Sequence, residues 1–256
     1  MSTDHPNRIA LNGPTMGTRW SAVFFAQATP GPALAAALQA AVDEVDAVMS
    51  TWKPDSDLMR LNSAPVGLWV EVPSQLCTIV ALGLQIGVES GGAFDIGVGA
   101  VVEAWGFGAS RMQPDGEEIA GLGAVTTQID IDLANSRLRR VSDGRLDLSG
   151  IAKGFGVDRL ADVLIAQGID SFIVSIEGEM RGCGAKPDGS GWVVGLERPD
   201  REARALARTI EMTDMALATS GDYRHWRVGR HHRVAHHRSP HGSPPQHHGL
   251  CRHSNR

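Results

Sequence analysis

The chain has 256 residues, 42% of them hydrophobic, which is enough apolar material for one large globular domain or two small ones. Its formal net charge is −5, and the residues after position 228 include five Arg but no acidic residue, so the preceding body is more acidic still. This balance argues against a nucleic-acid-binding surface. The three widely spaced cysteines argue against both a disulfide framework and a zinc knuckle.

No segment reaches about 18 consecutive apolar residues, so no transmembrane helix is expected. The first residues, MSTDHPNRIALNGPTMG, show no basic region followed by an apolar core, and no signal peptide is therefore visible. The sequence as it stands is therefore expected to be cytoplasmic, and the alternative is that an export signal was lost upstream with a misplaced start; the location stays unknown on the sequence alone.

The first half of the chain is expected to contain a strand followed by two helices. Residues 18–26, TRWSAVFFA, have the composition of a strand. An Ala- and Leu-rich helix should follow from Pro32, because proline suits the first helical turn. A second helix is expected within residues 74–92, with Gly91 ending it in a left-handed conformation.

The second half changes to short alternating runs separated by turn residues. Residues 127–150 predict antiparallel strands, and a helix is expected over residues 154–168. Two more strands are expected at residues 171–178 and 191–199. Because strands and helices do not alternate strictly, the predicted fold class is α+β with antiparallel sheets.

The segment LDLSGIAKGFG is the most informative for function. A strand is expected to end at Asp147, and a glycine-rich turn leads from there into the next helix. Such a turn exposes backbone N–H groups to a phosphate, and Lys153 adds a positive charge. The alternative is a strand-to-helix turn with a structural role alone.

Three further positions are candidates for ligand contacts. Asp95 interrupts an apolar, glycine-rich run, so its carboxylate should meet a backbone N–H, a hydroxyl or a ligand, unless it only caps a turn. Met16 and Trp52 can lie against a planar ring, although both residue types more often fill cores.

Taken in chain order, six segments resemble the ApbE family, the FAD:protein FMN transferases, from about residue 13 to 228. The resemblance implies a mixed α/β fold with antiparallel sheets and an enzyme that uses Mg²⁺. It also implies that FAD is split, that FMN is attached through a phosphoester to a Thr or Ser hydroxyl of a partner flavoprotein, and that AMP is released. The segments are PTMGT, MSTWKPDSDLMRLN, GGAFDIGVGAVVEAWGFG, DLSGIAKGFGVDRLAD, GCGAKPDGSGWVVGLERP and ALATSGDYR.

The resemblance also implies roles for individual residues of this sequence, although it assigns no catalytic side chain. Gly150 would offer its backbone carbonyl to Mg²⁺, which prefers oxygen ligands. The residues implied to contact FAD are Met16, Trp52, Ala93, Phe94, Asp95, Asp147 and Lys153.

The chain departs from the family pattern at two places. The usual Gly-Gly-Asp after a strand is here Glu177-Gly-Glu179. The family's H-x-I-D-P-x-T-G-x-P segment and a late Asp-x-x-x-Thr-like element, which supplies the other metal ligands, are not found in the written sequence. The alternative function is therefore a flavin-binding remnant without catalysis, in which the C-terminal part of the domain is missing.

Residues 229–256 contain eight of the ten histidines, which suggests either a metal-binding tail or an out-of-frame translation. Shifting the reading frame forward by one nucleotide allows codons 235–244 to spell His-Thr-Ile-Asp-Pro-Arg-Thr-Gly-Ala-Pro, the missing family segment. We therefore expect an incomplete transferase domain over residues 1–228, followed by an unstructured, out-of-frame tail that impairs folding and catalysis.

Overall fold

The computed structural model describes residues 6–104, 128–198, 205–220, 226–227, 233–234 and 250–254. The chain divides into two compact units. The first unit contains residues 1–44, 153–225 and 247–256, and the second contains residues 45–152 and 226–246. Among the described residues, no helix is long and apolar enough to cross a membrane.

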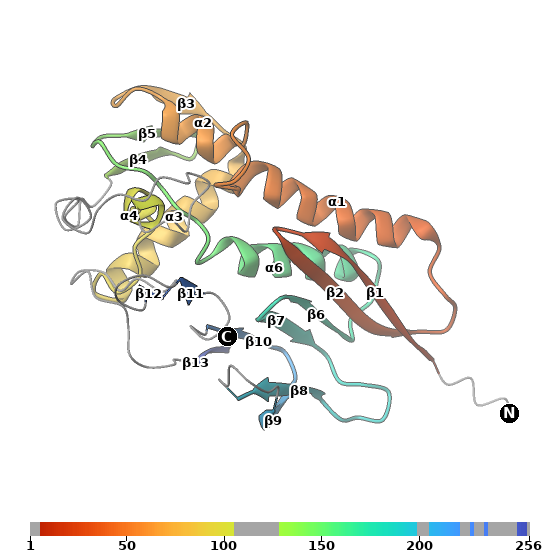
Figure 1. Ribbon diagram of the computed structural model, residues 1–256. Coiled ribbons are helices and arrows are strands. Elements are labelled where there is room, and N and C mark those ends of the chain that lie inside the picture. Colours follow the sequence, from red (N-terminus) through yellow and green to blue (C-terminus); the bar gives the residue numbers. More distant parts are fainter. Residues whose placement is uncertain are drawn as a thin grey trace, which may run out of the picture. The chain divides into compact units, whose positions relative to one another are not determined.

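A six-stranded antiparallel sheet forms the centre of the first unit (Figure 1). Its strands follow the spatial order β1-β2-β6-β7-β10-β13, and a separate hairpin pairs β8 with β9. The strands are β1 (Asn7–Thr15), β2 (Thr18–Ala26), β6 (Phe172–Ile176), β7 (Glu179–Cys183), β8 (Trp192–Glu197), β9 (Leu206–Met212), β10 (Met215–Thr219) and β13 (Leu250–Ser254).

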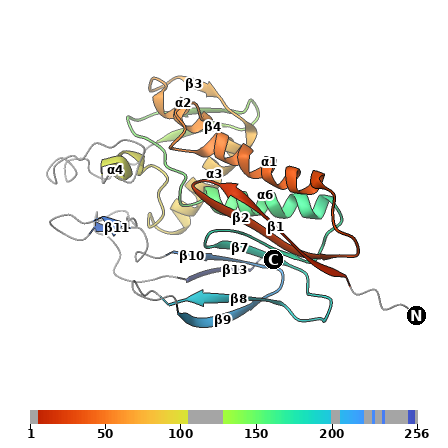
Figure 2. The same cartoon turned by 45° about the vertical axis from the view of Figure 1, so that its right-hand side comes forward.

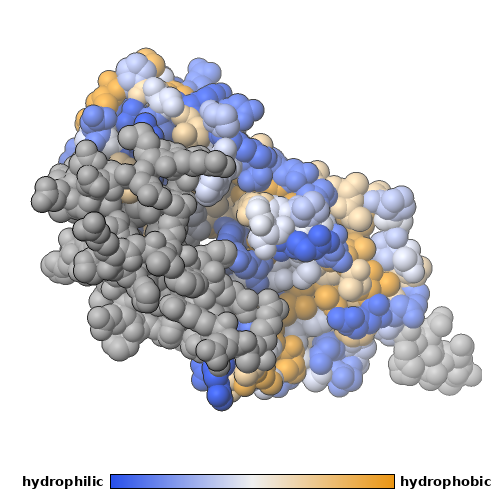
Figure 3. All heavy atoms as spheres, viewed as in Figure 1, coloured by the Kyte–Doolittle hydropathy of each residue, from blue (hydrophilic) through white to orange (hydrophobic). Residues whose placement is uncertain are grey.

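This sheet is buried on both faces because its central strands alternate apolar side chains between the two sides. One face is covered by α1 (Pro32–Met49) and α6 (Ala152–Ala166), and the other by the β8–β9 hairpin (Figure 2). Trp20 and Phe24 contact the helical side, whereas Phe25 packs toward the hairpin and lies 5.8 Å from the Trp192 ring centroid. On the surface visible in Figure 3, hydrophobic and hydrophilic residues are intermixed over the described part of this unit.

The second unit combines the long helix α3 and two short helices with a three-stranded antiparallel sheet of order β3-β5-β4. Ser56 caps α2 because its hydroxyl accepts a hydrogen bond from the Met59 N–H at 3.1 Å. The elements are α2 (Asp57–Ser63), β3 (Trp69–Glu71), α3 (Ser74–Glu89), α4 (Gly99–Ala104), β4 (Ile129–Asp132), β5 (Arg137–Arg140), β11 (Trp226–Arg227) and β12 (Arg233–Val234).

The α+β class with antiparallel sheets is confirmed, and so is the end of α3 before Gly91, which has a φ of 62°. The expected strand ending at Asp147 is wrong: Arg145 forms only an isolated parallel bridge with Val98. The following helix begins at Ala152, earlier than the glycine pattern predicts. Strand β1 was not predicted, because its polar and small residues lack a clear alternation.

Two short strands lie within the segment predicted to be out of frame. Strand β12 pairs with β11, and β13 pairs in antiparallel register with β10. The frame change itself stays a prediction. Resequencing the gene across codons 226–236 is expected to show one nucleotide more or fewer than the present reading requires, so that the corrected frame encodes the missing segment. A gene sequence that agrees with the present reading frame would contradict this interpretation.

Candidate functional site

The candidate residues fall into two groups, one in each unit. In the first unit, two hairpin turns lie at the same end of the six-stranded sheet, because Trp20 of β2 is paired with Ile176 of β6. Met16 and Gly17 form the turn between β1 and β2, and Glu177 and Gly178 form the turn between β6 and β7.

Both turns contain a non-glycine residue in the left-handed region. The φ of Met16 is 46° and that of Glu177 is 54°. Such a conformation costs a residue with a Cβ roughly 1–2 kcal/mol and is concentrated at functional positions. These two residues are therefore the strained points of this sheet end.

Met16 lies directly against the start of α6. A Cβ added at Gly156 would come within 3.2 Å of Met16 Cε and 2.8 Å of Ile176 Cδ1. A glycine at position 156 thus permits the half-buried Met16 side chain to rest beside the helix. Met16 therefore packs against α6 while the residue as a whole remains partly exposed.

Lys153, in the first turn of α6, forms an ion pair with Glu177. Their side chains are 31% and 40% exposed. Glu179 lies near this ion pair. Its Oε2 atom is buried, but it accepts no hydrogen bond from any of the described residues. Burial raises the pKa of the Glu179 carboxyl, the Lys153 ammonium opposes this rise, and the like charge of Glu177 adds to it.

The raised pKa of Glu179 predicts a pH-dependent stability. Between the unfolded and folded pKa values the folded protein binds more protons, so its free energy of unfolding falls as the pH rises through that interval. Glu179→Gln is expected to flatten this fall. Urea unfolding of both proteins from about pH 4 to pH 8 measures it, and identical pH slopes would contradict the assignment.

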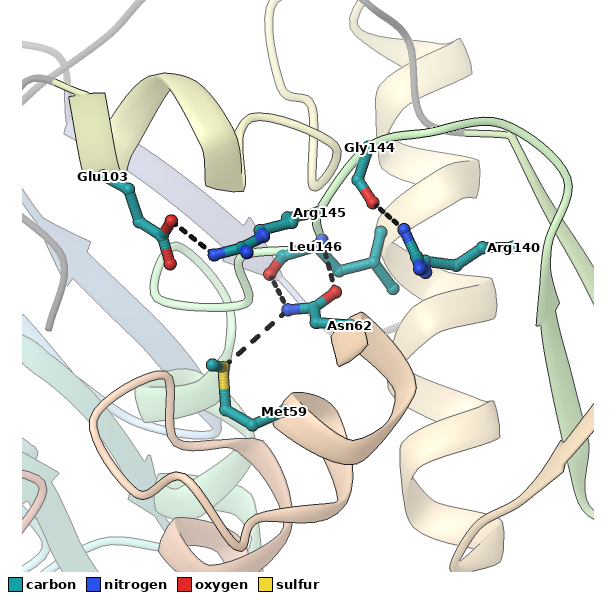
Figure 4. A network of polar contacts seen from close by, with 7 residues as sticks. All are labelled: Met59, Asn62, Glu103, Arg140, Gly144, Arg145 and Leu146. Atoms are coloured by element: carbon teal, nitrogen blue, oxygen red, sulfur yellow. Dashed lines mark hydrogen bonds and ion pairs between the residues drawn. The ribbon is translucent and has the colours of Figure 1, made fainter. Parts of the chain in front are cut away.

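In the second unit, the segment that leads to Asp147 is held by a polar network (Figure 4). The Asn62 side chain donates to the Leu146 carbonyl at 2.9 Å and accepts from the Leu146 N–H at 2.8 Å. Arg140 donates to the Gly144 carbonyl at 2.6 Å, and Arg145 pairs with Glu103 at 2.6 Å. Asn62 therefore satisfies both backbone groups of the residue before Asp147.

Asp147 and Asp95 lie on neighbouring segments of this unit. The Asp147 N–H donates to the carbonyl of Ile96, the residue after Asp95, at 2.8 Å. Each carboxylate also fixes its own turn: Asp95 Oδ1 accepts from the Gly97 N–H and Asp147 Oδ1 from the Ser149 N–H, both at 2.7 Å. Asp95 thus caps a turn, as the structural alternative predicted.

The aromatic candidates of the second unit differ in their surroundings. A Cβ added at Gly150 would lie 3.0 Å from the Phe94 ring, so the Phe94 side chain lies beside the turn that contains Gly150. Trp52 is 64% exposed, and its backbone N–H donates to Ser50 Oγ at 3.1 Å. Trp52 is therefore not a core residue.

The structure thus places Met16 and Lys153 in the first unit and the other candidates in the second. Sequence reasoning missed Asn62, and it counted Gly156 only as one glycine of the glycine-rich turn. The roles of both depend on contacts with residues distant in sequence. Glu177 and Glu179 had been noted only as departures from a pattern. The left-handed φ of Glu177 explains why glycine is favoured at this position.

The described residues do not make a complete Mg²⁺ site. Among them, no group of three or more His, Cys, Asp or Glu side chains lies together in a way that could hold a metal ion. Mg²⁺ requires near-octahedral oxygen coordination, and the Gly150 carbonyl supplies one oxygen. No chemical step is therefore assigned to a metal held by these residues.

Comparison with known proteins places this arrangement in a family. The sequence profile of the ApbE family matches residues 16–254. A FAD:protein FMN transferase from Vibrio cholerae is 37% identical over 227 residues, covering 86% of this chain and 67% of the relative. A FAD:protein FMN transferase from Klebsiella pneumoniae is 33% identical over 249 residues, covering 94% of this chain and 71% of the relative.

A solved structure agrees with these sequence matches. The apo form of the Pseudomonas stutzeri flavinyl transferase ApbE superposes with a TM-score of 0.81 at 32% identity, covering 96% of this chain and 79% of that one. The likeness includes the antiparallel sheets as well as the sequence segments that carry the candidate residues. The chain therefore belongs to the ApbE family.

Proposed function

We propose that this protein is a FAD:protein FMN transferase that attaches FMN to a Thr or Ser hydroxyl of a partner flavoprotein. In the reaction the acceptor oxygen forms a bond to the phosphorus on the FMN side of the FAD pyrophosphate. The bond from that phosphorus to the bridging oxygen breaks, and AMP leaves with both electrons of that bond. The proton of the hydroxyl is released to solvent or to a base.

The observation that best supports this proposal is the turn that contains Asp147, Gly150 and Lys153. Asn62 and Ile96 fix its start through hydrogen bonds to the Leu146 and Asp147 backbone, and α6 begins at its end. The N–H groups of Asp147, Ser149, Ile151 and Ala152 donate to protein oxygens, so the group that this turn can offer to phosphate oxygens is the Lys153 ammonium. Phosphoryl-group transfer depends mainly on such positioning and charge stabilisation.

We assign the remaining candidates to binding FAD. In the second unit, Trp52 is proposed to stack on a planar ring of FAD, and Ala93, Phe94 and Asp95 are proposed to contact FAD, with Phe94 packed at the Gly150 turn. In the first unit, Met16 is proposed to contact FAD through its sulfur. When bound, Mg²⁺ would neutralise charge on the pyrophosphate oxygens.

Acceptor-dependent release of AMP tests the proposal. Incubating the protein with FAD and an acceptor flavoprotein is expected to yield one AMP for each acceptor modified, measured by chromatography, and Asp147→Asn is expected to lower the rate about 10- to 100-fold. Parallel reactions with Mg²⁺ and with a chelator measure the dependence on metal. FAD that is bound but remains intact with every acceptor would overturn the proposal in favour of a binding protein.

A further inference from the structure

Glu177 combines two features that are costly for a surface turn residue. It adopts a left-handed φ of 54°, which disfavours any residue with a Cβ. Its carboxylate is nevertheless directed to Lys153 at the start of α6, with which it forms an ion pair. A strained backbone that holds a carboxylate next to a candidate ligand-binding lysine suggests that the carboxylate has a role there.

We propose that Glu177 is an internal competitor for Lys153, which lowers the affinity of this lysine for phosphate groups until a ligand displaces the carboxylate. This proposal rests on the proposed function, because it takes the pyrophosphate of FAD as the displacing ligand. A phosphate oxygen and the Glu177 carboxylate seek the same N–H donors of the ammonium group. The phosphate oxygen and the carboxylate cannot accept the same N–H of the Lys153 ammonium at the same position.

The strength of the ion pair suits such a competition. The Lys153 and Glu177 side chains are 31% and 40% exposed, and ion pairs in contact with solvent contribute little stability. A pyrophosphate with several negative oxygens can therefore displace the carboxylate. The competitor still matters, because the displaced Glu177 charge stays near the ligand and repels it.

The second carboxylate strengthens the effect. Glu179 lies close enough for Lys153 and Glu177 both to influence its pKa. The single lysine thus faces two acidic side chains, and the three groups together are negative whenever Glu179 is ionised. Removing the Glu177 charge leaves one lysine and one carboxyl, a combination that repels a phosphate far less.

The first test compares the affinity for FAD of the unmodified protein, Glu177→Gln and a control variant. Glutamine keeps the size and the left-handed strain of the turn but removes the charge, so FAD is expected to bind about 3- to 10-fold more tightly. Asp162→Asn removes a comparable exposed carboxylate, paired with Arg159 on the same helix, and should leave the affinity unchanged. In a Lys153→Met background Glu177→Gln should tighten binding less than in the unmodified protein, because only the direct repulsion between the Glu177 charge and the phosphates is then removed.

The second test does not depend on FAD. The chain has three lysines, so acetylation by an N-hydroxysuccinimide ester can be followed at each site by mass spectrometry. Inorganic pyrophosphate is expected to protect Lys153, and to do so at about 3- to 10-fold lower concentration in Glu177→Gln, while Lys186 serves as the internal control. Equal protection in both proteins, or none in either, would overturn the proposal.

The two tests separate failure of this inference from failure of the proposed function. A protein that does not transfer FMN can still show the shift in pyrophosphate protection at Lys153. An active transferase with unaltered FAD affinity in Glu177→Gln would refute the competition alone. Glu177→Gly separates strain from charge: it is expected to raise the urea midpoint of unfolding, which Glu177→Gln should not change.

Discussion

Replacing Asn62 by leucine is expected to lower the free energy of unfolding by about 2–4 kcal/mol, because two buried backbone groups lose their partner. The Asn62 amide satisfies both the N–H and the carbonyl of Leu146, and the Asn62 side chain is itself buried. Leucine has a similar volume but neither a donor nor an acceptor. Urea denaturation at neutral pH measures the loss.

The same substitution at an exposed asparagine provides the control. Asn7 lies at the exposed start of β1, and Asn7→Leu should change stability by no more than about 0.5 kcal/mol. Asn62→Asp provides a second variant: it can still accept from the Leu146 N–H but, when ionised, cannot donate to the carbonyl, so it should also destabilise. A loss below about 1 kcal/mol in Asn62→Leu would show that Leu146 finds other partners.

Replacing Lys153 by methionine is expected to weaken FAD binding about 10- to 100-fold, the effect of losing a charge-assisted hydrogen bond to phosphate. Methionine keeps most of the aliphatic length and favours a helix, so α6 should still form from Ala152. The loss should appear with inorganic pyrophosphate as well as with FAD. Isothermal titration calorimetry with both ligands measures it.

Lys186 supplies the matched control for this substitution. It lies in the loop between β7 and β8, and its backbone N–H donates to the Ser190 carbonyl at 2.8 Å. Lys186→Met should bind FAD as the unmodified protein does. Equal affinities for Lys153→Met and Lys186→Met would remove Lys153 from the proposed site.

The sequence predicted those elements whose local signals agree with their final packing. Helix α1 has an Ala- and Leu-rich composition and starts at Pro32, and β2 shows a run of apolar and β-branched residues that is buried in the first unit. The turn from Asp147 to Lys153 was recognisable from its glycines and its lysine. In these segments propensity, turn chemistry and burial all favour the same structure.

Other features depend on contacts that no local pattern encodes. The isolated bridge at Arg145 replaces the predicted strand because neighbouring backbone groups are bonded by the Asn62 side chain rather than by a sheet. The position of Met16 beside Gly156 joins two segments 140 residues apart. A left-handed glutamate is likewise unexpected, because turn statistics favour glycine or asparagine there.

The mass of an acceptor flavoprotein after incubation with FAD and this protein tests the central claim most directly. We predict that intact-protein mass spectrometry shows a covalent gain equal to one FMN less one water, absent when the target Thr or Ser of the acceptor is replaced by alanine. The rate of the same reaction is predicted to be higher with a chain in which the reading frame after residue 228 is restored to encode the family segment. An acceptor that stays unmodified with both chains, while FAD remains intact, would contradict the assignment as a transferase.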